Sequence, residues 1–213
     1  MTLKLHPAPC KHPYQSSSFL PFYLRKMRFP KALALFATIF VLFTSHMVKA
    51  DKWNDANRAI KRLDPKEFQA LPSHILEKLT TKGCTIPQSF ASNSPHNVIN
   101  GEFGETGQQD WAVLCSRTDS SSILIFWGGQ DSCPSEFLPS PDRSWLQHTG
   151  EGIGYSRVIT AVGPEFMLKH VDAYEGSPPP PITHQGINHS FLGKGASVQY
   201  CYEGEWIELF EAD

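Results

Sequence analysis

The 213-residue chain lacks the short motifs by which nucleophile-dependent and zinc-dependent enzymes are usually identified. There is no G-x-S-x-G elbow, and no S-x-x-K follows residue 50, which excludes the familiar serine-nucleophile classes. H-E-x-x-H, H-x-H and C-x-x-C are also absent, and with them the common zinc sites. The glycines of residues 150–154 precede a predicted strand at Ser156–Val162 instead of following one, so a dinucleotide loop is excluded as well.

Basic residues are scarce beyond residue 50. Twelve of the 19 Lys and Arg lie there with all 21 Asp and Glu, which gives this part a formal charge of −9 with His neutral. We find no basic cluster in it. This composition argues against nucleic acid and against an anionic membrane surface as partners.

Long apolar runs are missing too. The longest, Ala32–Thr44, has 13 residues. As a helix it would span about 20 Å, short of the ~30 Å hydrocarbon core, so no stable membrane span is predicted.

The N-terminal 50 residues are instead typical of a targeting segment. They hold seven Lys or Arg and no acid, and Val48 and Ala50 occupy positions −3 and −1 before Asp51. This order predicts a secretory signal peptide over residues 1–50, cut between Ala50 and Asp51, with Met27 as the expected true start. The mature protein is therefore expected to be periplasmic or secreted.

Residues 51–213 are long enough for a single domain with its own core. Apolar spacing predicts helices over 52–64, 65–71 and 73–83, and Gly163-Pro164 is expected to start another. Residues 130–154, rich in Pro and Gly, are expected to be mainly loop. Ala196–Tyr202 and Trp206–Phe210, joined by Glu203-Gly204-Glu205, predict a C-terminal β-hairpin.

The densest apolar content lies between Asn97 and Gly129. Trp111–Cys115 and Ile123–Trp127 are short, rich in β-forming residues and separated by a polar turn, which predicts an antiparallel hairpin. Residues 97–100 can add a third strand. The predicted fold class is α+β, with N-terminal helices packed on an antiparallel β-sheet that is closed by the C-terminal hairpin.

The loop that leads into this hairpin carries a local signature. Residues 101–113 read G-E-F-G-E-T-G-Q-Q-D-W-A-V. They resemble the FG-GAP/VCBS repeat of integrin-type propeller blades, roughly G-D-F-N-G-D-G-x-x-D-L-A-V. In that family the loop holds calcium, so the resemblance implies Glu102 and Asp110 as candidate calcium ligands. Gly104 and Thr106 replace two of the four oxygen donors, which weakens such a site.

A complete propeller is excluded by length. It needs at least four blades of about forty residues each, which this chain cannot supply. The resemblance therefore implies the shape of one loop within a smaller fold. The whole chain is also similar to small exported bacterial proteins, a resemblance that implies no particular activity. No cofactor other than calcium is suggested.

Four cysteines follow the predicted cleavage site: Cys84, Cys115, Cys133 and Cys201. In an exported domain they argue for two disulfides, for which three connectivities exist. Joining Cys84 to Cys115 would fasten the predicted helices onto the sheet, and Cys133 could then tie the long loop to Cys201 in the hairpin. A Cys115–Cys133 pair stays open as the rival, because only one hairpin separates these residues.

The histidines provide the remaining candidate chemistry. His170, Asp172, His184 and His189 could converge on an acid–base or metal site, since only a Pro-rich spacer separates the first pair from the second. Three functional hypotheses follow. The leading one is a non-catalytic exported binding or accessory protein of the cell envelope, with an envelope protein or a small molecule as its partner. The alternatives are a periplasmic hydrolase that uses the His170/His184/His189 cluster, and a calcium-stabilised adhesion-like module.

Overall fold

The computed structural model describes residues 51–171 and 178–210, without the side chains of His170, Val171 and Phe210. The predicted signal peptide, with Met27 and the residue before the cleavage site, Ala50, lies outside the described residues. Within the described ranges, no helix has the length and apolar character needed to cross a membrane.

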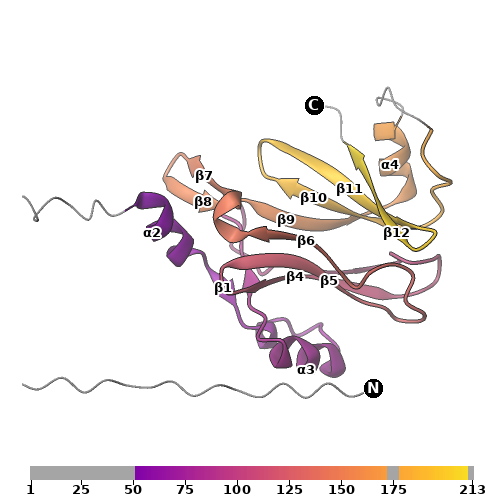
Figure 1. Ribbon diagram of the computed structural model, residues 1–213, viewed down its shortest axis with the longest axis horizontal. Helices are drawn as coiled ribbons and strands as arrows, with labels where there is room; N and C mark the ends of the chain where they lie inside the picture. Colours follow the sequence, from indigo (N-terminus) through magenta and orange to yellow (C-terminus); the bar gives the residue numbers. More distant parts are fainter. Residues whose placement is uncertain (1–50, 172–177, 211–213) are drawn as a thin grey trace, which may run out of the picture. The chain divides into compact units, whose positions relative to one another are not determined.

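Two four-stranded antiparallel sheets form the centre of the fold (Figure 1). In each of them the strands are neighbours in the order in which they occur along the chain, so each sheet is a meander. The first sheet consists of β3 (Val98–Gly101), β4 (Asp110–Arg117), β5 (Ser120–Phe126) and β6 (Glu136–Pro141). The second consists of β9 (Arg157–Val162), β10 (Gly186–Phe191), β11 (Gly195–Tyr202) and β12 (Glu205–Phe210).

Smaller elements surround the two sheets. Two-stranded sheets are formed by β1 (Arg62–Leu63) with β2 (Ile86–Pro87), and by β7 (Leu146–Thr149) with β8 (Gly152–Tyr155). The described helices are α2 (Lys52–Ala59), α3 (Ser73–Thr81) and α4 (Pro164–Val171), with one-turn 3-10 helices η1 (Pro65–Glu67) and η2 (Asp142–Trp145).

The two predicted hairpins are present. In β4–β5, Val113 pairs with Leu124, and the two-residue turn Thr118-Asp119 has positive φ at both positions. Such a turn matches the right-handed twist of the strands that it joins. β3 adds the expected third strand, with Val98 opposite Val113. The C-terminal hairpin is β11–β12, with the same kind of turn at Glu203-Gly204.

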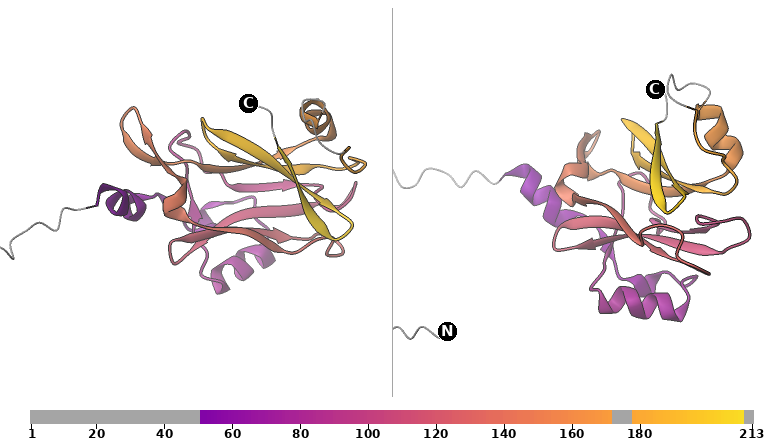
Figure 2. Two further views of the ribbon diagram at one scale, coloured as in Figure 1. Left: turned by 45° about the horizontal axis from the view of Figure 1, so that its top comes forward. Right: turned by 45° about the vertical axis from the view of Figure 1, so that its right-hand side comes forward.

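The core lies between the sheets and on both outer faces. Alternate residues of β4 and β5 point in opposite directions, so Leu114 faces the second sheet while Val113 faces α3. On the far side, Met167 of α4 packs against Val198 and Tyr200 of β11. Figure 2 shows α3 outside the first sheet and α4 outside the second in both of its views. The layer order is therefore α3, first sheet, second sheet, α4.

One edge of the sandwich is joined by an amide. Asn97, fully buried immediately before β3, donates from Nδ2 to the carbonyl oxygen of Arg157 (3.2 Å) and accepts at Oδ1 from the backbone N–H of Ile159 (3.0 Å). The same Nδ2 donates to the carbonyl oxygen of Pro87 at 2.7 Å. The Asn97 side chain thus forms one donated and one accepted hydrogen bond with the backbone of β9, as the backbone of a neighbouring strand would.

The opposite edge is joined by aromatic rings. The indole of Trp206 on β12 stacks on Phe137 of β6, with ring centroids 4.2 Å apart, and on Trp127 at 6.1 Å. Its Nε1 donates to the carbonyl oxygen of Pro134 at 2.9 Å. Burying these rings together fastens β12 to β6 and to the loop that precedes β6.

The four cysteines in the described part of the chain form two disulfides, Cys84–Cys115 and Cys133–Cys201. Both are the pairs that the sequence argument favoured over Cys115–Cys133. The first attaches the chain that follows α3 to β4. The second attaches the loop between β5 and β6 to β11, and so links the first sheet to the second.

The predicted fold class, α+β with helices on one sheet, is wrong. The described chain is mostly β: 12 strands in four sheets, with only three short α-helices. The region 130–154, expected to be loop, contains β6, β7 and β8, and β10 was not predicted at all. These strands carry Pro, Gly or polar residues in place of an apolar alternation, so their sequences lack the usual signal.

The N-terminal helices are also shorter than predicted. α2 ends at Ala59, because Ile60 adopts an extended ψ of 122° and the chain turns into β1. The segment 65–71 forms only the single turn η1, although Asp64 caps it as its sequence suggests. α3 begins at Ser73 as expected and ends at Thr81, before the predicted end at residue 83; its N-cap is Pro72, which makes no side-chain hydrogen bond.

Candidate ligand-binding groove

Asp110, one of the two candidate calcium ligands, has a carboxylate that is already surrounded by donors. Oδ2 accepts from the backbone N–H groups of Phe103 and Gly104, both at 3.0 Å, and Oδ1 accepts from Gln108 Nε2 at 2.8 Å and Gly128 N at 2.9 Å. An ionised carboxylate has about four lone-pair sites, so these bonds fill its capacity. The carboxylate therefore holds the loop of residues 101–110 in shape by itself.

Glu102, the other candidate ligand, is bound through its backbone. Its N–H donates to Gln185 Oε1 at 2.8 Å, and its carbonyl oxygen accepts from Gln185 N at 3.0 Å. Within the described part of the chain, no group of three His, Cys, Asp or Glu side chains could hold a metal ion.

The two described histidines of the predicted cluster have different partners. The ring of His184 stacks on Tyr200 at 4.3 Å, and its Nε2 lies 3.0 Å from the carbonyl oxygen of Cys201. His189 instead contacts Trp145 and Arg157 between the sheets. The side chain of His170 and all of Asp172 lie outside the described residues.

His189 belongs to a buried network around the Arg157 guanidinium. Arg157 donates to His189 Nε2 (2.9 Å), to the carbonyl oxygen of Ser121 (2.7 Å) and to that of Leu138 (2.7 Å). The Arg157 guanidinium also lies over the ring of Trp145, 4.7 Å from its centroid. Burial, together with the charge of Arg157, lowers the pKa of His189 to about 3. The imidazole is therefore neutral at ordinary pH and accepts through Nε2.

Ser89 and His96 form a pair that sequence analysis did not identify. Ser89 Oγ lies 2.9 Å from His96 Nε2, and His96 Nδ1 lies 2.9 Å from the carbonyl oxygen of Ser94, which resembles a nucleophile, a base and an orienting group. However, the backbone N–H of Ser89 also donates to Nε2, and that of Phe90 donates to Tyr155. The N–H groups of Ser89 and Phe90, which are the best placed to form an oxyanion hole, are therefore already hydrogen-bonded and cannot stabilise a developing charge. We interpret the Ser89–His96 pair as structural: it connects the two ends of the loop of residues 88–97.

A groove of about 480 Å³ lies between α3 and the β5–β6 side of the first sheet. It is larger than two other cavities, of about 370 and 380 Å³, at the β3–β9 edge and at the β10–β11 turn. Its lining has a polar rim, with His74, Lys78 and Lys82 on the α3 side and Asp131, Ser135 and Glu136 opposite. The floor runs from Leu124 to Trp127 at the end of β5, where Leu124 and Phe126 face α3 and Ile125 faces the core between the sheets.

Both walls of the groove are fixed. The α3 wall is held by Ile75 and Leu79, which are buried against the sheet, and by the Cys84–Cys115 disulfide just beyond the helix. The opposite wall is held by Cys133–Cys201 and by the bond from Trp127 Nε1 to Ser135 Oγ at 3.1 Å. Because the walls do not depend on a ligand for their position, the groove is preformed, as most small-molecule sites are.

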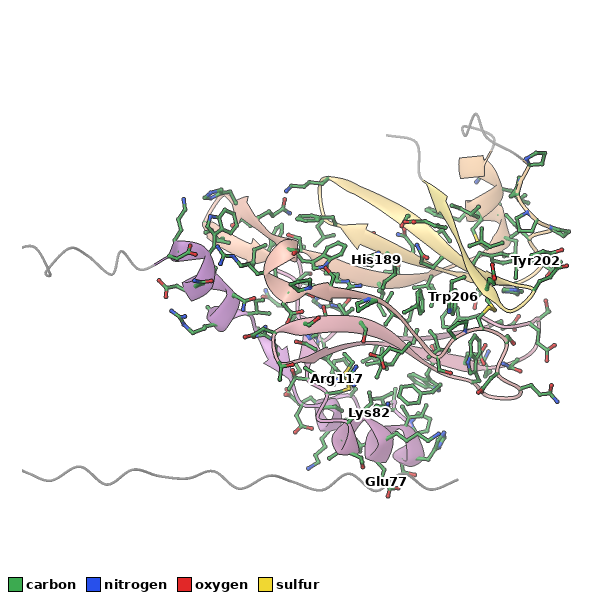
Figure 3. All side chains as sticks on the ribbon, viewed as in Figure 1. Glu77, Lys82, Arg117, His189, Tyr202 and Trp206 are labelled. Atoms are coloured by element: carbon green, nitrogen blue, oxygen red, sulfur yellow. A yellow bond between two sulfur atoms is a disulfide. The ribbon has the colours of Figure 1, made fainter. Side chains whose placement is uncertain are left out.

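The acidic side of the groove is partly neutralised. Glu136 accepts from the Ser122 hydroxyl at 2.7 Å and pairs with Arg117. The Ser122 hydrogen bond, followed by the positive charges of Arg117 and Lys82, lowers the pKa of Glu136. Figure 3 labels Lys82 and Arg117 close to each other beside α3, and Glu77 on the face of α3 away from the sheet.

The cationic side was missed by the sequence analysis, which found no basic cluster. His74, Lys78 and Lys82 are spaced by four residues, the spacing that places side chains on one face of a helix. This signal was present in the sequence. What could not be read from it is which strand would lie opposite that face.

We compared the chain with protein-family models, with curated proteins and with solved structures, and none of the three comparisons gives a match.

Proposed function

We propose that this chain is a non-catalytic exported binding protein of the cell envelope, and that its ligand binds in the groove beside α3. The observation that carries the proposal is the groove itself. Charged side chains and an apolar floor that includes Phe126 meet there in a cavity whose two walls are each attached by a disulfide. Preorganised walls reduce the entropy lost when a ligand binds.

Two disulfides also support export. Such bonds persist in oxidising compartments such as the periplasm or the extracellular medium and are rare in reducing ones. Residues 25–51 also favour export, because basic residues, an apolar run and small residues before Asp51 follow one another there. We expect the protein isolated from its host to begin at Asp51 and to lie outside the cytoplasm. N-terminal sequencing that finds residue 27 or an earlier one on the mature protein would contradict this.

The hydrolase alternative has less support. It needs His170, His184 and His189 at one site, whereas the described rings of His184 and His189 have separate partners. The calcium-stabilised module likewise needs a carboxylate with free lone pairs, and Asp110 already accepts four N–H groups. For the FG-GAP-like sequence we therefore propose only that it sets the conformation of the loop of residues 101–110.

A ligand screen with a matched pair of variants tests the groove. Ligand-observed NMR is run with a fragment set of mixed charge on the protein that starts at Asp51. His74→Trp places a bulky ring at the rim, whereas Glu77→Trp places the same ring on the side of α3 that points away from the sheet, outside the groove lining. Both positions are exposed, so both variants should fold.

We expect fragments to bind the wild type and Glu77→Trp, and to lose binding in His74→Trp. Equal binding by the two variants would place the ligand elsewhere. If no fragment binds the wild type, the groove is not a ligand site.

A further inference from the structure

The charges of the groove are unevenly distributed. Lys78 and Lys82 are exposed on the rim, and neither takes part in an ion pair among the residues that the structure describes. His74 extends the same stripe by one turn toward the start of the helix. Two ammonium groups without an ion-pair partner at one rim therefore favour an anion there.

The acids of the groove do not cancel this charge. Glu136 is already paired with Arg117 and hydrogen-bonded to Ser122, which leaves Asp131 as the remaining carboxylate in the lining. Residues 51–213 taken together are acidic, with a formal charge of −9. A cationic rim in an acidic protein selects an anion at that place, while the surrounding surface repels extended polyanions and anionic bilayers.

The floor supplies a second requirement. It is formed by Leu124 and Phe126, whose uncharged side chains face α3, and by Trp127 at the end of β5, whereas the side chain of Ile125 lies in the core between the sheets. A volume of about 480 Å³ lies within the range of pockets that enclose a ligand of drug size. A simple inorganic anion would leave this floor exposed to water.

We propose that the groove binds a free single-chain or aromatic amphiphile that carries one carboxylate or phosphate monoester group. This inference rests on the proposed function and specifies its ligand class. The headgroup lies at the ammonium groups of Lys78 and Lys82, and the apolar body contacts the floor at Leu124, Phe126 and Trp127. Charge at the rim then decides which amphiphiles are accepted, and apolar contact with the floor adds affinity.

Calorimetric titration with two matched probe series tests this class. The first series is 1-naphthoate, 1-naphthamide and 1-naphthylmethylammonium. The second is decanoate, decyl phosphate and decyltrimethylammonium, each below its micelle concentration. We expect the anionic members of at least one series to bind about tenfold or more tighter than the neutral or cationic ones, with a preference that weakens in high salt.

Charge variants connect this preference to the rim. Lys78→Gln/Lys82→Gln should remove most of the preference, and Lys78→Glu/Lys82→Glu should reverse it toward the cationic probes. Lys66→Gln/Lys169→Gln removes the same charge from exposed sites outside the groove lining and should change anion binding less than about twofold.

The possible failures are distinguishable. Equal binding of all charges, lost only in His74→Trp, would keep the groove as a site and overturn the anionic class. An anion preference that survives in Lys78→Gln/Lys82→Gln would overturn the assignment to the rim. Binding to anionic phospholipid vesicles without binding of the free probes would identify a membrane surface as the partner and also overturn the proposal. Absence of any binding refutes both the class and the proposed function.

Discussion

Arg157 donates its Nε hydrogen to Nε2 of His189 across 2.9 Å in the interior between the two sheets. The pKa of this imidazole is lowered from 6.5 to about 3, by burial first and by the charge of Arg157 second. In the unfolded chain the same ring takes up a proton near its ordinary pKa. The folded state is therefore favoured above pH 6.5, and this contribution is lost as the pH falls toward 3.

The first prediction follows from the lowered pKa of His189. Between pH 6.5 and 4 the free energy of unfolding should fall by up to about 1.4 kcal/mol per pH unit through His189, in addition to what the carboxylates contribute. His189→Gln keeps an acceptor for Arg157 without the titration, so its stability should depend less steeply on pH. Urea unfolding at a series of pH values measures both slopes. His148→Gln, at an exposed ring, should keep the wild-type slope, and parallel slopes for His189→Gln would refute the prediction.

The second prediction concerns calcium. Because four N–H groups fill the carboxylate of Asp110, chelation should leave the melting temperature unchanged. Asp110→Asn replaces acceptor oxygen by donor nitrogen and should cost roughly 2–4 kcal/mol of stability whether or not calcium is present. Differential scanning calorimetry with and without chelator checks both expectations. A fall of several degrees on chelation, restored by calcium, would show a working calcium site.

The third prediction concerns the disulfides. Cys84→Ala/Cys115→Ala opens a connection across 31 residues of sequence and should lose roughly 3–4 kcal/mol. Cys133→Ala/Cys201→Ala opens one across 68 and should lose about 4 kcal/mol, because a longer loop regains more chain entropy. Denaturant unfolding measures both. Peptide mapping without reduction should find these two pairs, and a Cys115–Cys133 peptide would exclude the pairing.

The fourth prediction concerns the amide that joins β3 to β9. Asn97→Asp keeps the shape of the side chain but faces a carboxylate toward the carbonyl oxygens of Pro87 and Arg157, which the amide nitrogen now donates to. We expect a loss of about 3 kcal/mol, since a buried charge would be left without donors there. Asn100→Asp, exposed on the same strand, should change stability by no more than about 0.5 kcal/mol. Similar melting temperatures for the two variants would contradict this account.

The sequence predicted those strands whose side chains alternate or form an apolar run. β4, β5, β11 and β12 belong to this group, and each turn between them contains one residue that tolerates positive φ, Asp119 in the first and Gly204 in the second. β6 and β10 read as E-F-L-P-S-P and G-I-N-H-S-F, which suggest a loop. They become strands because neighbouring strands and the inter-sheet core provide their partners, and this information is not local to either segment.

The candidate site was predictable only in part. Topology favoured the Cys84–Cys115 pair, since Cys84 follows the helix that packs on the sheet, but it left Cys115–Cys133 open. The cationic stripe on α3 could have been found from its four-residue spacing. The groove could not, because it depends on a second wall: the loop before β6 is held in place by Trp206 and Cys201, more than sixty residues further along the chain.

The sequential strand order of the two sheets has a consequence for how the protein matures. Each meander is a continuous stretch of chain, residues 98–141 and 157–210, so each can pair its strands without waiting for the other. A chain that emerges N-terminus first can close Cys84–Cys115 as soon as the first meander forms. Cys133–Cys201 must wait until β11 has emerged and docked. Maturation should therefore pass through a one-disulfide species in which Cys133 and Cys201 are free thiols, open to oxidoreductases until the second half of the chain arrives.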